Sequence, residues 1–269
     1  MSSPEKGMSA AQASSKKRGG HINEQHFAKL IGGCVNPVDH TRKQDVHDLT
    51  RGWRYSVKSG KKWQIFLYGK NRLETNTILQ GIAQISPLMI KCIDTLPKTR
   101  DMREKNPTRY KEMLQTPMRK LAKELSKEKI LRAFLSKSLF DAGQVEFLAI
   151  LPSSIDQTTA SLNDKKFHVF SAEEVITGLW KGMTVTNSQA RGIGQTDAQK
   201  VIFRATIDNK SRNIGEIELR TDSQNYGRVK FWLQSNLVLP MLAEHIPESG
   251  NIGRQIILHG KARKIANRK

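Results

Sequence analysis

The stretch QDVHDLTRGWRYSVKSGKKWQIFLY, residues 44–68, has the pattern of three short strands separated by two turns. Aromatic and β-branched residues dominate the three runs, and the turns at TRG and SGKK carry glycine and charged residues. Because side chains two positions apart in a strand point to the same face, Ser56 and Lys58 are expected to lie side by side. The sequence therefore predicts a hairpin over residues 44–68, with a serine and a lysine on one face.

A helix is predicted just before this stretch, in the segment GGHINEQHFAKLIGG. Phe27 and Ile31 in this segment belong to one apolar stripe at helical spacing. Asn23 is a suitable N-cap, and the glycine pair that starts at Gly32 is a suitable end. We therefore expect a short helix packed against the strands, with residues 1–19 as a disordered basic tail in front of it.

The later part of the chain adds further strands. Within residues 200–235, the runs QKVIFRATI, IGEIELRTD and GRVKFWLQS alternate or are rich in β-branched residues, and the polar segments DNKSRN and SQNYG separate them. Helical patterns occupy much of the chain between the two groups of strands. The simplest fold class is a single α/β (α+β) domain over residues 20–260, with a central mixed β-sheet flanked by helices. A second basic tail is expected at residues 261–269.

The charge of the chain is strongly unbalanced. Lysine and arginine number 45 against 25 aspartate and glutamate, a formal net charge of +20. Such an excess repels itself on folding, so a polyanionic partner explains it, and nucleic acid is the expected one. No apolar run approaches the ~20 residues that span a bilayer, and the N-terminus lacks the apolar core of a secretory signal. With only Cys34 and Cys92 as thiols, we expect a cytoplasmic protein that does not bind membranes.

Charged side chains converge on the predicted strands. Asp45 lies on the strand before the one that carries Lys58, so the two side chains can meet at one edge of the sheet. Glu24, on the helix packed behind, can reach the same place. Mg²⁺ prefers carboxylate oxygens, and a lysine can position a water molecule and offset charge that develops on a phosphate. These residues predict a magnesium site for phosphodiester hydrolysis.

The segments GHINEQHFAKLIGG, QDV and YSVKSG together resemble the opening of the PD-(D/E)XK nucleases, in particular of type II restriction endonucleases. In that family a helix with a glutamate precedes a strand with an aspartate, and the next strand carries an acidic residue, any residue and a lysine. The resemblance implies a restriction-endonuclease-like core in which Asp45 and Glu24 bind the metal and Lys58 is the catalytic lysine. It covers residues 20–68, under a fifth of the chain.

The resemblance also implies an activity, namely Mg²⁺-dependent hydrolysis of double-stranded DNA at a short specific sequence, as in a restriction system. Such enzymes commonly act as homodimers on symmetric sites. Ser56 departs from the pattern, because it stands where the family usually has Asp or Glu and cannot supply a second charged ligand. Asp48 is a spare carboxylate, but three positions from Asp45 it should face the opposite way on a regular strand.

DNA contacts are predicted beside these strands and in the late hairpin. Lysines that flank a glycine turn suit phosphate, and arginine and asparagine suit base edges. The residues expected to contact DNA are Lys61, Lys62, Gln64, Arg220, Asp222, Asn225 and Arg228.

Two alternatives follow from the same residues. The first is a non-catalytic DNA- or RNA-binding protein in which Lys58 is solvated charge and Asp45 caps a turn or pairs with Arg54. The second is a zinc-stabilised module, because five potential zinc ligands fall within a short segment, although their spacing departs from the usual repeated pairs. Those ligands are His21, His26, Cys34, His40 and His47.

Overall fold

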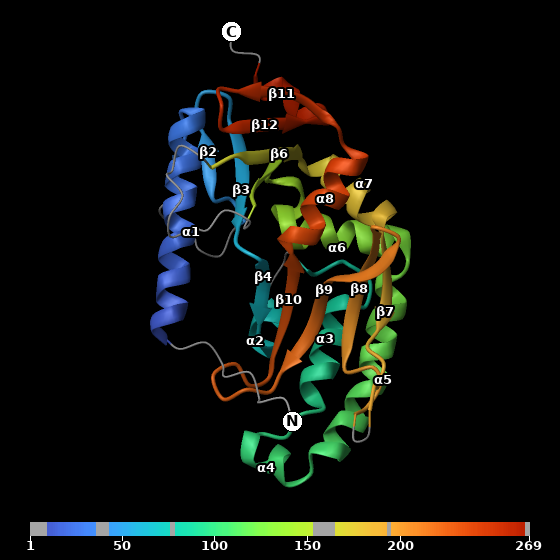
Figure 1. Cartoon of the computed structure of the whole chain (residues 1–269). Coiled ribbons are helices and arrows are strands. Elements are labelled where there is room, and N and C mark those ends of the chain that lie inside the picture. Colours follow the sequence, from blue (N-terminus) through green and yellow to red (C-terminus); the bar gives the residue numbers. More distant parts are fainter. Residues whose placement is uncertain (1–9, 36–42, 76–78, 153–164, 193–194, 267–269) are drawn as a thin grey trace.

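The strands of the computed structural model form two sheets (Figure 1). Sheet A is a seven-stranded mixed sheet of order β1-β2-β3-β5-β6-β12-β11, and sheet B is a five-stranded antiparallel sheet of order β4-β10-β9-β8-β7. The α/β (α+β) class is confirmed, with two sheets in place of one central sheet. The structure describes residues 10–35, 43–75, 79–152, 165–192 and 195–266, with side chains from Gly19 onwards.

The strands of sheet A are short and lie far apart in the sequence. They are β1 (Cys34–Val35), β2 (Val46–Asp48), β3 (Trp53–Ser59), β5 (Phe147–Leu151), β6 (Phe167–Ser171), β11 (Glu248–Ile252) and β12 (Ile256–His259). The strands of sheet B are β4 (Lys62–Tyr68), β7 (Met183–Asn187), β8 (Lys200–Ile207), β9 (Lys210–Arg220) and β10 (Arg228–Gln234). The three late strands β8, β9 and β10 are those that the sequence predicted.

Helices connect and cover the sheets. They are α1 (Ala10–Ile31), α2 (Lys70–Thr75), α3 (Ile85–Asp94), α4 (Arg100–Lys105), α5 (Pro107–Leu125), α6 (Glu128–Phe140), α7 (Ala172–Gly182) and α8 (Ser235–His245), with the 3₁₀ turns η1 (Asp141–Gly143) and η3 (Gly260–Ile265). Among the described helices, none combines the length and apolar character that crossing a membrane requires.

Helix α1 runs along sheet A (Figure 1) and closes a small aromatic core. The ring of Phe27 lies 5.3 Å from that of Tyr55 on β3 and 5.0 Å from that of Phe167 on β6. β5 is buried on both faces: Phe147 belongs to the core under α1, whereas Ile150 belongs to the larger core on the other side. Sheet A is therefore the layer that separates two apolar clusters.

The larger core lies between sheet B and the helices α3, α5 and α6, and it extends to the inner face of sheet A. Phe134 on α6 lies 5.2 Å from Phe231 on β10 and 6.2 Å from Phe66 on β4, measured between ring centroids. β9 and β10 approach closely at Gly215, where an added Cβ would lie 2.5 Å from Leu233 Cδ2. One continuous core thus joins the two sheets into a single unit.

The segment 44–68 forms three strands as predicted, but only two of them are neighbours. β2 pairs with β3 in sheet A, whereas β4 pairs with β10 in sheet B, so the expected hairpin between β3 and β4 is wrong. The chain crosses between the sheets at Gly60, whose φ of 83° is in the left-handed region that glycine tolerates. The backbone N–H of Ser235 donates to the Lys61 carbonyl at 3.1 Å, which ties the crossing to the start of α8.

The ends of the chain also differ from the sequence prediction. α1 begins at Ala10, so residues 10–19 are helical where a tail was expected, and Asn23 lies inside the helix and not at its N-cap. The run AAQASSKKR is rich in good helix formers, which favours this extension. At the other end, the 3₁₀ turn η3 buries Ala262 and Ile265 in the core under α1, so the described part of the predicted tail 261–269 is packed. Residues 1–9 and 267–269 lie outside the described residues.

Candidate active site

The carboxylate of Asp45 and the amine of Lys58 are in direct contact. Asp45 lies just before β2, where its backbone N–H donates to the Tyr55 carbonyl at 2.9 Å. Asp45 Oδ2 accepts from Lys58 Nζ at 2.9 Å, from the Val57 backbone N–H at 2.7 Å and from Ser56 Oγ at 3.2 Å. The predicted trio of Asp45, Ser56 and Lys58 is therefore assembled around one carboxylate oxygen.

This contact leaves part of each group available. Lys58 and Asp45 have side chains that are 18% and 20% exposed, whereas Ser56 is fully buried. Within the described residues, every hydrogen bond to the Asp45 carboxylate ends on Oδ2. Oδ1 therefore retains its capacity to accept a further donor or to bind a cation.

Lys43 is a third charged residue at this site, and the sequence reasoning did not single it out. Its backbone N–H donates to Asp141 Oδ2 at 2.6 Å, and its Nζ donates to the carbonyl of Ile65 on β4. Burial, followed by the charge of Lys58, lowers the pKa of Lys43 to about 8. Lys43 therefore links the segment before β2 both to the end of α6 and to sheet B.

Glu24, predicted as a metal ligand, has a different partner. Its Oε2 lies 3.2 Å from Nδ1 of His21, one turn earlier on α1. No described hydrogen bond or ion pair joins Glu24 to Asp45 or Lys58. Across the described ranges, no group of three or more His, Cys, Asp or Glu side chains is close enough to hold a metal ion. Of the two predicted carboxylate ligands, the structure therefore places only Asp45 beside Lys58 among the described contacts.

Asp48 has a structural role at the β2–β3 turn. It is buried, its Oδ1 accepts from the backbone N–H groups of Thr50 and Arg51 at 3.1 Å, and its Oδ2 pairs with Arg51 Nη1 at 2.6 Å. The alternative pairing of Asp45 with Arg54 is not present among the described contacts, where the Arg54 backbone N–H donates to Glu146. Asp48, rather than Asp45, is the residue that caps this turn.

The predicted zinc ligands do not gather in the described structure. His21 contacts Glu24, and His26 Nε2 lies 3.1 Å from Gln255 Nε2. Cys34 is exposed on β1, and its backbone lies opposite that of His47 in the pairing of β1 with β2. His40 lies outside the described residues.

The predicted DNA contacts belong to sheet B rather than to the strands around Asp45. Lys62 and Gln64 are exposed on β4, and Lys61 is exposed just before it. The guanidinium of Arg220 pairs with Asp222 Oδ2 at 2.9 Å through Nε. Asp222 Oδ1 also accepts from the backbone N–H and from Nδ2 of Asn225 at 3.0 and 3.1 Å, and Arg228 is exposed at the start of β10.

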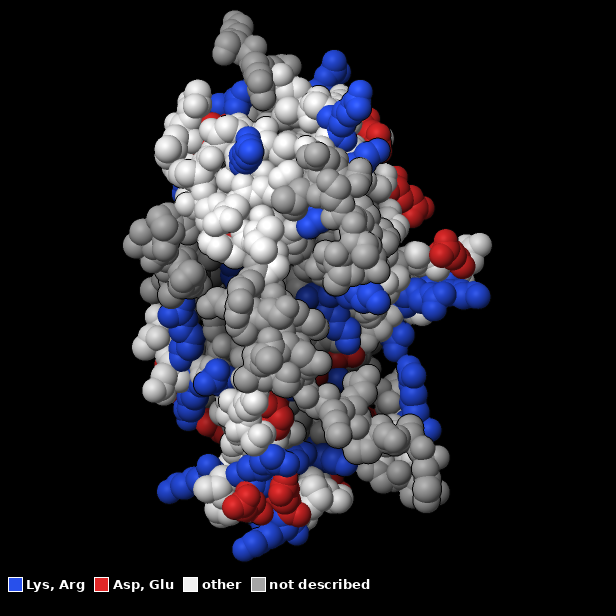
Figure 2. All heavy atoms as spheres, turned by 60° about the vertical axis from the view of Figure 1, so that its left-hand side comes forward, with Lys and Arg blue, Asp and Glu red and all other residues white. Residues whose placement is uncertain are grey.

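Basic side chains are not confined to one patch. Figure 2 shows lysine and arginine spread over the described surface on this side, with acidic residues in smaller groups. On this side of the molecule the basic side chains are thus spread over the described surface and not gathered at one site. A distributed charge favours contact with a long polyanion over binding of a small anion.

No protein-family model and no curated protein matches this chain. A lysine held against a carboxylate with one remaining oxygen, in a strongly basic protein, is suited to binding a phosphate together with a hard cation.

Proposed function

We propose that this protein is a Mg²⁺-dependent endonuclease that hydrolyses phosphodiester bonds of double-stranded DNA at a short specific sequence, with Asp45 and Lys58 at its active site. The observation that carries the proposal is the 2.9 Å contact between Lys58 Nζ and Asp45 Oδ2. Sequence alternation predicted this pair, and the resemblance to PD-(D/E)XK nucleases gives both residues a role. The charge of +20 supports a polyanionic substrate.

The donor set fits Mg²⁺ held mainly by water and phosphate. In phosphate-processing sites Mg²⁺ is usually bound by one or two carboxylates together with substrate oxygens, and it keeps several waters. Asp45 offers its Oδ1 for this purpose, because the described hydrogen bonds all end on Oδ2. The buried hydroxyl of Ser56 donates to the same carboxylate and so helps to fix its orientation.

In the proposed reaction the oxygen of a water molecule forms a bond to phosphorus, and the ester bond opposite it breaks. One new strand end keeps the phosphate, and the leaving ester oxygen becomes the hydroxyl of the other end, with a net transfer to it of the proton that the water loses. Bound Mg²⁺ would polarise the phosphate and lower the pKa of a nearby water. The side chain of Asp45 holds its position through three hydrogen bonds and presents a negative charge to the cation. Lys58 is held at the same carboxylate, from which its amine can orient the water and offset charge on the phosphate oxygens.

Nicking of supercoiled plasmid in Mg²⁺, compared with EDTA, tests the proposal. The wild-type protein is expected to cut only in Mg²⁺, and Lys58→Ala is expected to abolish cutting while DNA binding is retained. Lys129→Ala is the matched control, because Lys129 is exposed on α6, far along the chain from the site. The melting temperature of each variant, compared with that of the wild type, distinguishes a loss of activity from a loss of folding.

Two results would overturn the proposal. Full cleavage by Lys58→Ala would remove Lys58 from the chemistry. Salt-sensitive DNA binding by the wild type without any nicking across several DNA substrates would favour the alternative, a non-catalytic DNA- or RNA-binding protein. Sedimentation or light scattering in the presence of a duplex that the protein cleaves would show whether the active form is a homodimer, as the resemblance implies.

A further inference from the structure

One face of sheet B packs on helices, and the opposite face is lined by charged side chains. The strand register places Lys200 on β8, Glu218 on β9 and Lys230 on β10 in one row across the sheet. Ile202, Glu216 and Trp232 form the next row. We call this surface the polar face. Besides the apolar side chains of Leu67, Ile202 and Trp232, it carries those of Lys62, Gln64, Lys200, Arg204, Glu216, Glu218, Arg220, Arg228 and Lys230.

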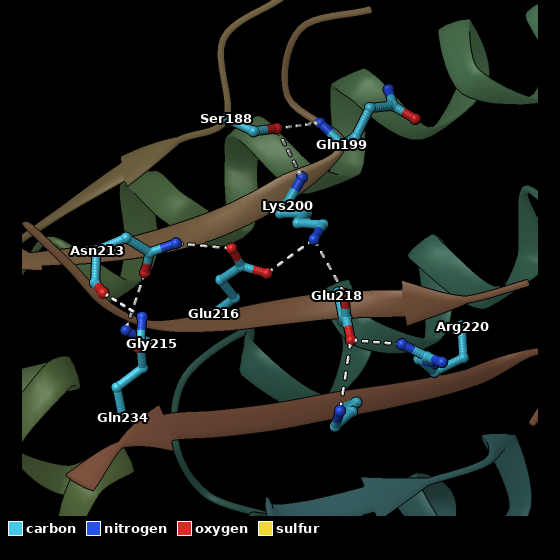
Figure 3. A network of polar contacts seen from close by, with 10 residues as sticks. Ser188, Gln199, Lys200, Asn213, Gly215, Glu216, Glu218, Arg220 and Gln234 are labelled. Atoms are coloured by element: carbon cyan, nitrogen blue, oxygen red, sulfur yellow. Dashed lines mark hydrogen bonds and ion pairs between the residues drawn. The ribbon is translucent and has the colours of Figure 1, made fainter. Parts of the chain in front are cut away.

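A continuous ion-pair network crosses the polar face (Figure 3). Lys200 Nζ lies 2.8 Å from Glu216 Oε2 and 3.1 Å from Glu218 Oε2. Arg220 Nη1 lies 2.8 Å from Glu218 Oε1, and Lys230 Nζ lies 3.7 Å from the same oxygen. Two glutamates thus hold three cations from three adjacent strands.

The glutamates of the network are covered and the cations are not. The side chains of Glu216 and Glu218 are 11% and 12% exposed, whereas those of Lys200, Arg220 and Lys230 are 39%, 32% and 24% exposed. Burial alone would raise the pKa of Glu218, but the neighbouring Lys200 and Arg220 lower it, so the carboxylate stays charged. The accessible charge of the network is therefore positive, and the glutamates fix where the cations stand.

We propose that the polar face of sheet B binds the phosphate backbone of double-stranded DNA. Complementary charge carries the inference, because the exposed cations Lys62 and Arg228 lie on the same face as the cations of the network, and Arg228 stands opposite Arg220 in the strand register. Neighbouring strands lie about 4.8 Å apart, so the four strands that carry these cations span about 15 Å across the sheet. Phosphate contacts of this kind set the position and orientation of a protein on a duplex.

The burial of the aromatic residue on this face favours a duplex over a single-stranded nucleic acid as the partner. Proteins that bind single strands present exposed aromatic rings on which bases stack. Of the described residues on the polar face, Trp232 is the only aromatic one, and it is 6% exposed with Lys62 Nζ 4.6 Å from its ring centroid. A covered tryptophan offers no stacking platform, and it also offers no apolar anchor for a membrane.

This inference rests on the proposed function, which names double-stranded DNA as the substrate. The two can fail separately, because binding in EDTA does not depend on cleavage. The assay is fluorescence anisotropy of a labelled DNA duplex in EDTA, with the dissociation constant measured at several salt concentrations between about 50 and 200 mM.

The test variants are Lys62→Gln and Arg228→Gln, singly and together. Both residues are exposed, and no ion pair of either is found among the described contacts, so these changes leave the network intact. Each lost phosphate contact is expected to flatten the slope of log K against log salt by about 0.9, and the double variant by about twice that. Lys129→Gln is the control, because it removes the same charge from α6 on the opposite side of sheet B. Lys230→Gln then tests a cation of the network itself.

The expected result is weaker duplex binding with a flatter salt slope for the polar-face variants, and a slope for Lys129→Gln that matches the wild type. Equal slopes for the test and control variants would overturn the inference, and the proposed cleavage by Asp45 and Lys58 would stand. Tighter binding of single-stranded DNA, RNA or anionic vesicles than of duplex, lost in the same variants, would assign the face to another partner and would also contradict the inference.

Discussion

Lys58 Nζ and Asp45 Oδ2 lie 2.9 Å apart, although Lys58 is on β3 and Asp45 lies just before β2. β3 brings Lys58 to the segment before β2 because the two strands pair antiparallel, with Tyr55 opposite Val46. An ion pair between groups that are only 18% and 20% exposed is formed and held by the sheet itself.

By the resemblance to PD-(D/E)XK nucleases, Ser56 would stand where that family usually has a second acid, and Ser56→Asp would supply one. In EDTA a second carboxylate at a fully buried position beside Asp45 should lower the melting temperature, because the two charges repel each other. Mg²⁺ should then raise the melting temperature more in Ser56→Asp than in the wild type, and lower concentrations of Mg²⁺ should support cleavage. Ser56→Asn, similar in size but uncharged, is the control. An equal response to Mg²⁺ in Ser56→Asp and the wild type would exclude a metal at this position.

Tyr55→Phe should leave the protein as stable as the wild type or stabilise it by about 1 kcal/mol. The Tyr55 hydroxyl is buried and has no hydrogen-bond partner among the described residues, so its removal relieves an unpaired polar group. The ring itself stacks on Phe147 at 5.2 Å between centroids and is retained in the variant. Urea unfolding measures the difference. Tyr55→Leu is the companion variant, and it should cost about 2–4 kcal/mol because it leaves a cavity.

The histidine pair between β6 and β12 should make the protein sensitive to acid. His168 Nδ1 lies 3.0 Å from His259 Nε2. Burial, and next the neighbouring His259, lower the pKa of His168 from 6.5 to about 4. Because the unfolded chain binds this proton more readily, the contribution of His168 to stability should be constant above pH 6.5 and should fall as the pH drops from 6.5 towards 4.

Melting temperatures at a series of pH values measure this effect, with His168→Gln as the comparison. The variant cannot take up the proton, so its melting temperature should fall less steeply than that of the wild type over the same range. Parallel curves would show that other groups, such as carboxylates, account for the acid sensitivity.

The parts of the candidate site that depend on strand alternation were predictable from the sequence. The contacts between residues far apart in the sequence were not. Residues two apart share a face, which placed Ser56 beside Lys58, and the same rule applied to Lys43 and Asp45 would have drawn attention to Lys43. Asp141 contacts Lys43 from the end of α6, and no local pattern relates the two. Glu24 was predicted from its place on a helix, but His21 one turn away is its partner, because residues three apart on a helix are neighbours.

The sequence by itself determined several of the individual elements. Alternation and β-branched residues fix β3, β4, β8, β9 and β10, and the capping box of Ser171 with Glu174 fixes the start of α7. Only the tertiary structure decided which strands are neighbours. After β3 the chain crosses at Gly60 to sheet B, where β4 pairs with β10, more than 150 positions later. This pairing is favoured because Trp63 and Phe66 of β4 are buried in the core beneath sheet B. Strand pairing at that distance is selected by burial of apolar surface, which no local pattern contains.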